Sequence, residues 1–211
     1  QAAKINKVKK VIHTSTSEVY GTAKYVPMDE NHPINAQSPY SASKISADHI
    51  AQSFYNSFNL PVVVLRPFNT FGPRQSLRAV IPTIIGQALN EQKIKVGNLK
   101  PTRDFNYVED IINGFYLTLK SKNRKIFGEV INLGTGYEVS IKNLLKIIQK
   151  ITKKKFSFKI ENKRIRLKKS EVFRLKANNK KAKKLLGWKP KYSGYKGLSK
   201  ALSFTYSWYS K

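Results

Sequence analysis

Two short apolar runs constrain the fold more than any other feature of this sequence, because a segment with the spacing of a long helix lies between them. Residues 10–15 and 61–65 are rich in β-branched side chains, which is typical of strands buried in a parallel sheet. Residues 40–58 carry apolar side chains at helical intervals. A strand, a helix and a strand in this order predict a parallel βαβ unit, so we expect an α/β fold.

Hydroxyl and carboxylate side chains follow the first predicted strand directly. Thr16, Ser17 and Glu18 stand at its carboxyl end. Ligands of open α/β sheets bind at that end of the strands. Two hydroxyls and a carboxylate at this edge therefore indicate an acid/base site.

The predicted helix begins with groups that can handle protons. Ser38 suits the N-cap and Pro39 the first helical position, so Tyr40 and Lys44 are expected on one face, a turn apart. An ammonium at that spacing favours the phenolate, which can act as a base near neutral pH. A tyrosine and a lysine at this spacing also occur by chance, and Tyr40 would then be an ordinary half-buried ring.

Periodic segments continue beyond residue 65. They predict helices at 79–90, 108–119, 141–152, 178–186 and 193–209, and strands at 94–96 and 128–134. Asn178 and Gly187 suit the start and the end of the fourth of these helices, and Trp188 is expected to pack in the core. The pair Gly134-x-Gly136 lacks the third glycine and the helix of a dinucleotide-binding turn, so we do not interpret it as one.

Four motifs occur in order along the chain. They are His13-Thr-Ser-Thr-Ser-Glu-Val-Tyr-Gly21, Ser38-Pro-Tyr-x-x-x-Lys44, Arg66-Pro-Phe-Asn-Thr-Phe-Gly-Pro73 and Arg103-Asp-Phe-x-Tyr-Val-x-Asp110. Together they resemble the extended short-chain dehydrogenase/reductases that act on nucleotide sugars, the NAD-dependent epimerase/dehydratase family, over residues 1 to about 209. Within that family, residues 69–76 followed by 78–82 are most similar to the 4,6-dehydratases of the legionaminic-acid type.

The resemblance implies a doubly wound, Rossmann-type parallel sheet with a smaller α/β substrate-binding lobe. Residues 1–75 would be the C-terminal part of the NAD-binding domain, with the catalytic Thr/Tyr/Lys. Residues 76–211 would be mainly the substrate lobe, with segments near 101–135 returning to the first domain. Family members begin with a Gly-x-x-Gly-x-x-Gly turn that holds the dinucleotide pyrophosphate, and these residues contain none. We therefore expect the chain to start in mid-domain and to bind NAD negligibly by itself.

The resemblance also implies the ligands and the site residues. The cofactor would be NAD, the substrate a nucleotide-diphosphate sugar, and no metal site is expected. The implied catalytic residues are Tyr40, Lys44, Thr16, Glu18 and Ser17. The implied cofactor contacts are Tyr40, Lys44, Pro67 and Thr70, and the implied substrate contacts are Thr16, Asn69, Arg103 and Arg166. Asn69 could instead be an ordinary loop residue, and Arg103 could form a structural ion pair with Asp104 or Asp110.

The implied reaction is 4,6-dehydration. Tyr40 would take the C4 hydroxyl proton as hydride passes to NAD, Glu18 would remove the C5 proton, water would leave from C6, and hydride would return to C6. Ser17 stands where thymidine-diphosphate-glucose dehydratases carry an aspartate that protonates the leaving hydroxyl, so Glu18 or a water would have to assist. The related glucuronate decarboxylases share Thr-Ser-Glu, so decarboxylation and 4-epimerisation remain alternatives. A third alternative is a non-catalytic half-domain that pairs with a separately encoded glycine-loop piece.

A net charge of +28 raises the question of nucleic-acid binding. Residues 1–119 hold 13 Lys and Arg against 8 Asp and Glu, whereas residues 120–211 hold 27 against 4. Lysine predominates, although base readout and phosphate forks favour arginine, and no nucleic-acid-binding motif is recognisable. We therefore expect a solvated lysine-rich surface, no specific nucleic acid and no membrane partner. The resemblance implies a cytoplasmic homodimer.

Overall fold

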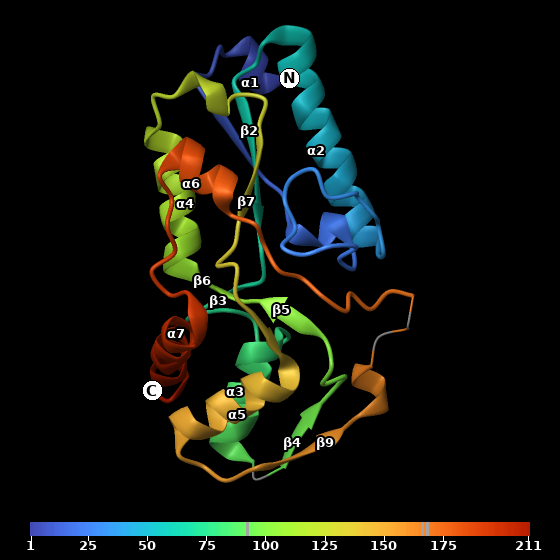
Figure 1. The fold of residues 1–211 in the computed structure, drawn as a ribbon, viewed down its shortest axis with the longest axis vertical. Helices are drawn as coiled ribbons and strands as arrows, with labels where there is room; N and C mark the ends of the chain where they lie inside the picture. Colours follow the sequence, from blue (N-terminus) through green and yellow to red (C-terminus); the bar gives the residue numbers. More distant parts are fainter. Residues whose placement is uncertain (92, 166, 168) are drawn as a thin grey trace.

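The computed structural model describes residues 1–91, 93–165, 167 and 169–211, and Figure 1 shows their path. The helices are α1 Ala2–Ile5, α2 Pro39–Phe58, α3 Val80–Asn90, α4 Val108–Lys120, α5 Ile141–Thr152, α6 Lys180–Leu186 and α7 Gly194–Tyr209, with 3-10 turns η1 Ser17–Tyr20, η2 Arg124–Ile126 and η3 Asn162–Arg164. The strands are β1 Val11–Thr14, β2 Val62–Pro67, β3 Thr70–Phe71, β4 Lys93–Val96, β5 Thr102–Asp104, β6 Asn106–Tyr107, β7 Val130–Leu133, β8 Glu138–Ser140 and β9 Ser157–Ile160.

A three-stranded parallel sheet forms the upper part of the molecule in Figure 1, in the order β1-β2-β7. Val11 pairs with Val62 and Val64 pairs with Val130. Helix α2 lies along one side of these strands and α4 and α6 along the other (Figure 1). The predicted βαβ unit of residues 10–65 is thus confirmed, and the side chains of the central strand are buried as a sheet covered on both faces requires.

Helix α2 begins and ends where its sequence signals lie. The Ser38 hydroxyl accepts a hydrogen bond from the Ser41 amide at 3.1 Å, and the Ser41 hydroxyl accepts one from the Ser38 amide at 3.1 Å. This reciprocal capping box satisfies two amides that the first turn leaves without helical partners. Asn59 ends the helix with a left-handed φ of 53°, a conformation that asparagine tolerates better than most residues.

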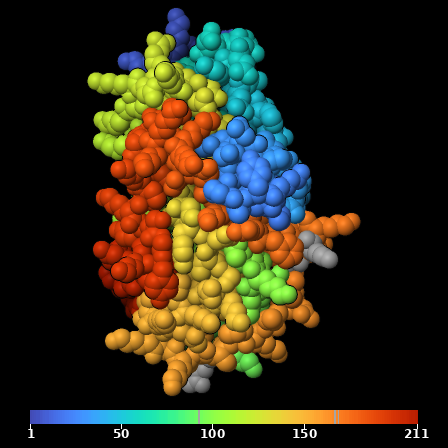
Figure 2. All heavy atoms as spheres, in the orientation of Figure 1, coloured from blue at the N-terminus to red at the C-terminus, as the bar shows by residue number. Residues whose placement is uncertain are grey.

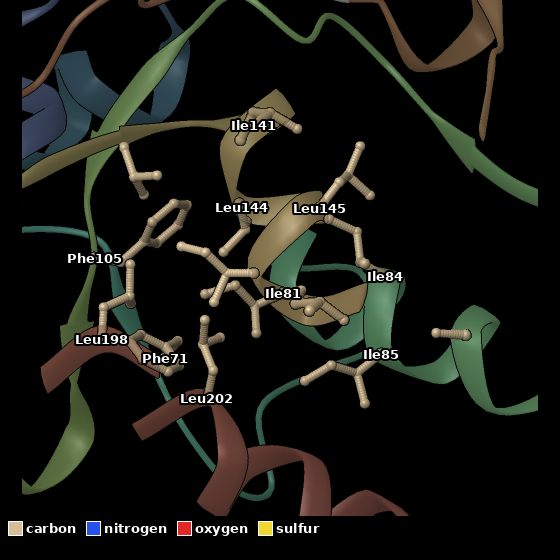
Figure 3. Close-up of a cluster of buried hydrophobic side chains, with 14 of the residues drawn as sticks. Phe71, Ile81, Ile84, Ile85, Phe105, Ile141, Leu144, Leu145, Leu198 and Leu202 are labelled. Carbon is tan, nitrogen blue, oxygen red and sulfur yellow. The ribbon is translucent and has the colours of Figure 1, made fainter. Parts of the chain in front are cut away.

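Helices α3, α5 and α7 enclose the core of the lower lobe, which Figure 3 shows in close-up. Ile81, Ile84 and Ile85 of α3 face Leu144 and Leu145 of α5 there (Figure 3). Complete burial of one such side chain contributes about 1.5–3 kcal/mol. The predicted helices at 79–90, 108–119, 141–152 and 193–209 and the strand at 94–96 are confirmed within a residue or so at their ends.

Helix α6 packs on the parallel sheet through the cluster that contains Trp188. The indole is fully buried and its Nε1 donates to the carbonyl oxygen of Asp110 at 2.9 Å, so its predicted core position is confirmed. Gly187 ends α6 at a φ of 67°, as predicted. The helix begins one residue later than predicted, with Asn179 at the N-cap, while the Asn178 side chain accepts from the Lys180 amide.

An extended segment, residues 172–178, connects the two parts of the molecule. The Met28 amide donates to Lys176 O at 2.8 Å, on the side of the parallel sheet. On the side of the lower lobe, the Thr102 amide donates to Phe173 O at 2.9 Å. Figure 2 shows this orange segment beside the blue loop that follows β1. None of the helices in the described part of the chain has the length and apolar character needed to cross a membrane.

Candidate active site

The turn after β1 places a carboxylate at the carboxyl edge of the parallel sheet. Thr16 is the N-cap of η1, and its hydroxyl accepts a hydrogen bond from the Glu18 amide at 3.2 Å. Ser17 is buried, whereas Glu18 reaches a cavity. Because Gly21 adopts a φ of 64° at the end of η1, the chain can reverse immediately after this turn.

Lys44 joins helix α2 to the same edge. Its Nζ donates a hydrogen bond of 2.7 Å to the carbonyl oxygen of Thr14, the last residue of β1. Tyr40 lies one turn earlier on α2 and is 54% exposed. Among the described residues the Tyr40 hydroxyl has no hydrogen-bond partner. The structure thus brings the two predicted catalytic stretches together at one edge and leaves the phenol open to a ligand.

A buried carboxylate fixes α2 against the strands. Asp48 accepts hydrogen bonds from Ser15 Oγ at 2.8 Å, from His13 Nε2 at 3.1 Å and from Arg66 Nε and Nη2 at 3.1 and 2.9 Å. Burial acts to raise the pKa of Asp48, but the hydrogen bonds from His13 and Ser15 and the charge of Arg66 outweigh it, so the pKa lies below its ordinary value. Since Asp48 lies two turns after Tyr40, it sets the position of α2 beneath the exposed phenol.

A cavity of about 490 Å³ opens between the sheet edge and the lower lobe. Four of the predicted site residues line it, namely Glu18, Asn69, Thr70 and Arg103. Tyr40, Lys44, Thr16, Ser17 and Pro67 are not among the described residues of its wall. The Asn69 Oδ1 atom is buried without a partner in the described structure, which is unusual for a buried polar atom and leaves it able to accept a hydrogen bond from a ligand.

Positive charge gathers on the lower wall of this cavity. Arg78, Lys95, Arg103 and Arg164 line it. Arg103 donates to Glu171 at 3.3 Å, and Arg164 donates to Glu161 at 2.7 Å. The alternative partners predicted for Arg103 were Asp104 and Asp110, and the ion pair is formed with Glu171 instead. A cavity with several cations in its wall is suited to an anionic ligand such as a diphosphate.

Several wall residues were not found from the sequence. Arg78 lies within the stretch that carried the finer resemblance, and Arg164 lies two residues before Arg166, but neither spacing singled them out. Gln75 also lies within that stretch, and neither it nor Glu171 was assigned a role from the sequence. Arg166, the predicted distal contact, lies outside the described residues.

The residues present fit part of a nicotinamide site. An exposed phenol and an ammonium at the carboxyl edge of a parallel sheet are in the place where dinucleotides bind in such folds. Thr70 lines the adjoining cavity. The amide of Gly136 donates to Asp104 at 2.8 Å, so the Gly134-x-Gly136 turn is already engaged within the protein. Within the described ranges no group of His, Asp and Glu is arranged to hold a metal ion.

Comparison with known proteins identifies relatives of this arrangement. A family model described as GDP-mannose 4,6 dehydratase matches residues 1–201. The dTDP-D-glucose 4,6-dehydratase of Dictyostelium discoideum is 37% identical over 164 residues, which cover 72% of this chain and 37% of that protein.

Two solved structures are similar over nearly the whole chain. One is the UDP-glucuronic acid 4-epimerase from Bacillus cereus, in complex with UDP-glucuronic acid and NAD, with a TM-score of 0.89 and 32% sequence identity. The aligned region covers 99% of this chain and 63% of the epimerase chain. The other is the dTDP-glucose 4,6-dehydratase from Bacillus anthracis, in complex with NAD, with a TM-score of 0.85 and 30% sequence identity. The aligned region covers 99% of this chain and 64% of the dehydratase chain. This chain spans less than two thirds of each of these three relatives.

Proposed function

The chain belongs to the NAD-dependent epimerase/dehydratase family, and from that premise we propose that it acts in the 4,6-dehydration of a nucleotide-diphosphate sugar. One observation carries the proposal: the Glu18 carboxylate opens onto the same cavity as Arg78, Arg103 and Arg164. A proton acceptor for the sugar and cations for the diphosphate thus share one space. NAD supplies the hydride acceptor and the hydride donor when it is bound.

Tyr40 and Lys44 handle the first proton in this proposal. Tyr40, as a phenolate, takes the proton of the C4 hydroxyl while C4 loses its hydride. Lys44, whose Nζ donates to Thr14 O at the end of β1, would place a positive charge one helical turn from Tyr40. Thr16 is the N-cap of the turn after β1. Its hydroxyl would form a hydrogen bond to the C4 hydroxyl of the sugar and so orient it.

Glu18 handles the second proton. The ketone at C4 makes the C5 hydrogen acidic, Glu18 removes it, and the C6 hydroxyl leaves as water. Because Ser17 is buried, its hydroxyl is poorly placed to protonate the leaving group. We assign that proton to Glu18 or to a water held by it.

The remaining predicted residues would hold the ligands. Arg103 would bind the diphosphate, for which its fork of donors is suited. Asn69, with its buried unpartnered oxygen, would accept a hydrogen bond from the sugar. Pro67 and Thr70 would flank the nicotinamide. Arg166 would make the distal nucleotide contact.

A second candidate is 4-epimerisation, because a 4-epimerase has a TM-score of 0.89 with this chain. Epimerisation needs the proton transfer at C4 but no base at C5. It therefore requires Tyr40 and Lys44 and does not require Glu18. This difference makes the two reactions separable by substitution.

The test is a mass-spectrometric assay of the full-length gene product with NAD and a panel of nucleotide-diphosphate sugars in deuterated water. We expect loss of water and deuterium at C5. Tyr40→Phe should abolish every product, whereas Glu18→Gln should allow C4 oxidation and slow dehydration by about 10²–10⁴. The matched control is Tyr116→Phe on α4, since Tyr116 is also 54% exposed. If wild type and Glu18→Gln both give a product of the same mass as the substrate, the dehydratase proposal is refuted and 4-epimerisation takes its place. Loss of carbon dioxide from a glucuronate would establish decarboxylation.

A further inference from the structure

A single buried carboxylate lies where three segments of the chain meet. Asp104, at the end of β5, is 0% exposed. It accepts hydrogen bonds from Thr135 N at 3.0 Å, Thr135 Oγ1 at 2.6 Å, Gly136 N at 2.8 Å, Ala177 N at 3.1 Å and Asn106 Nδ2 at 3.3 Å. The donors come from the loop after β7, the connecting segment 172–178 and β6. A buried carboxylate with this many donors holds its neighbours in one geometry.

The neighbouring residue on β5 points to the cavity. Arg103 lines the cavity wall and pairs with Glu171, while Asp104 faces the interior. Opposite orientations are expected because successive side chains of a strand point to opposite faces. The position of Asp104 therefore sets the position of Arg103.

The same carboxylate also places the partner of Arg103. Ala177, which donates to Asp104, belongs to the segment that continues back to Glu171. That segment is paired with β5 as well, because the Leu175 amide donates to Thr102 O at 3.2 Å. Both members of the Arg103–Glu171 pair are thus tied to Asp104 through short stretches of backbone.

A glycine makes this junction possible. A Cβ atom on Gly134 would lie 2.3 Å from the Cβ of Ala177 and 3.2 Å from the Asp104 Oδ2 atom. Only a residue without a side chain lets the end of β7 approach segment 172–178 so closely. The close approach brings the Ala177 amide within reach of the carboxylate.

We propose that Asp104 is a positioning residue for the anion-binding wall of the cavity, and that it acts through Arg103. The inference rests on the proposed function only in taking a nucleoside diphosphate as the anion. Asp104 does not touch the ligand. It holds β5 against the loop at 134–136 and segment 172–178, so that the guanidinium stands at the wall before the ligand arrives. Donors that are already held in place bind a ligand more tightly because they lose less conformational entropy on binding.

The test measures ligand binding by NMR titration with uridine diphosphate and thymidine diphosphate, and with uridine and thymidine as ligands that lack phosphate. Asp104→Asn should weaken diphosphate binding about tenfold and leave nucleoside binding unchanged. In an Arg103→Ala background, Asp104→Asn should have no further effect. The matched control is Asp110→Asn, because Asp110 is a buried carboxylate that accepts from the Lys191 and Tyr192 amides at 2.8 and 3.0 Å away from the cavity wall.

Equal losses for nucleoside and diphosphate, additive effects with Arg103→Ala, or the same loss in Asp110→Asn would each overturn the inference. Thr135→Val, which removes one donor and keeps the shape, provides the same comparison if Asp104→Asn does not fold. A wild-type protein that binds neither diphosphate would refute the proposed function and the inference with it. Diphosphate binding without coupling between Asp104 and Arg103 would refute the inference alone.

Discussion

We predict that the buried carboxylate of Asp104 makes the free energy of unfolding depend on pH. Its complete burial raises the pKa from the ordinary value of 3.8 to about 6, although hydrogen bonds from Thr135, Ala177 and Gly136 act to lower it. Desolvation prevails because the site contains no full positive charge among the donors. The folded protein therefore holds a proton on Asp104 at pH values where the unfolded chain has released it.

The sign and the size follow from proton linkage. Between pH 4 and about pH 7 the folded state binds more protons at this group than the unfolded state, so the free energy of unfolding falls as pH rises through the folded pKa and is level from about one pH unit above it. A gap of about two pKa units corresponds to about 3 kcal/mol over the whole range. Between pH 4.5 and pH 7.5 the expected loss is about 2 kcal/mol.

Urea denaturation of wild type and Asp104→Asn at closely spaced pH values measures the contribution of Asp104 to the pH dependence of the free energy of unfolding. The variant will be less stable at every pH because the amide cannot replace all the acceptor sites, but the slope attributable to Asp104 should vanish. Glu138→Gln is a control of opposite sign, because the hydrogen bond from Arg174 holds the pKa of Glu138 below its ordinary value. Its stabilisation is present above the unfolded pKa and is lost as pH falls. Parallel curves for wild type and Asp104→Asn would refute the reasoning.

Two further predictions concern the core and the charged surface. Leu144→Ala, at a side chain that is 0% exposed in the lower lobe, should lower the free energy of unfolding by about 2–5 kcal/mol in urea denaturation. Leu119→Ala, at a side chain that is 61% exposed, should change it by less than about 0.5 kcal/mol, and equal effects would contradict the assignment of the core. DNA binding measured by fluorescence anisotropy should be indifferent to sequence and largely lost between about 50 and 200 mM salt. A sequence-specific complex that survives this change would show that the lysines of residues 120–211 form a specific binding site and not only a solvated surface.

Elements of the fold were predictable where their signals are local. The N-cap at Ser38, the stop at Gly187 and the periodicity of α2, α3, α4, α5 and α7 all act within a few residues, so the sequence displays them directly. The start of α6 shows the limit of such signals. Asn178 and Asn179 both suit a cap, and the structure uses the Asn178 side chain for the Lys180 amide while the helix begins after Asn179. Neighbouring side chains of the same type cannot be ranked from sequence alone.

The candidate site was predictable in part for the same reason. The Tyr40 and Lys44 spacing and the turn at Thr16 to Glu18 are short motifs, and their meeting follows from the parallel βαβ unit. The lining of the cavity could not be predicted, because it joins segments that are far apart in the chain. Arg78 and Arg164 carry no spacing that marks them. Their place in the wall depends on how the lower lobe folds back on β5.

The sequence by itself determined the βαβ unit, most of the helix ends and which candidate side chains lie at the sheet edge, since these depend on local conformational preferences and on the burial of periodic apolar side chains. Only the tertiary structure decided which groups pair across the cavity and beneath it. Arg103 pairs with Glu171, 68 residues away, and Asp104 accepts from Ala177, 73 residues away. Partners at such separations are selected by the closure of long loops and by the cost of leaving a buried carboxylate without donors, and neither constraint leaves a mark on the residues next to them in the chain.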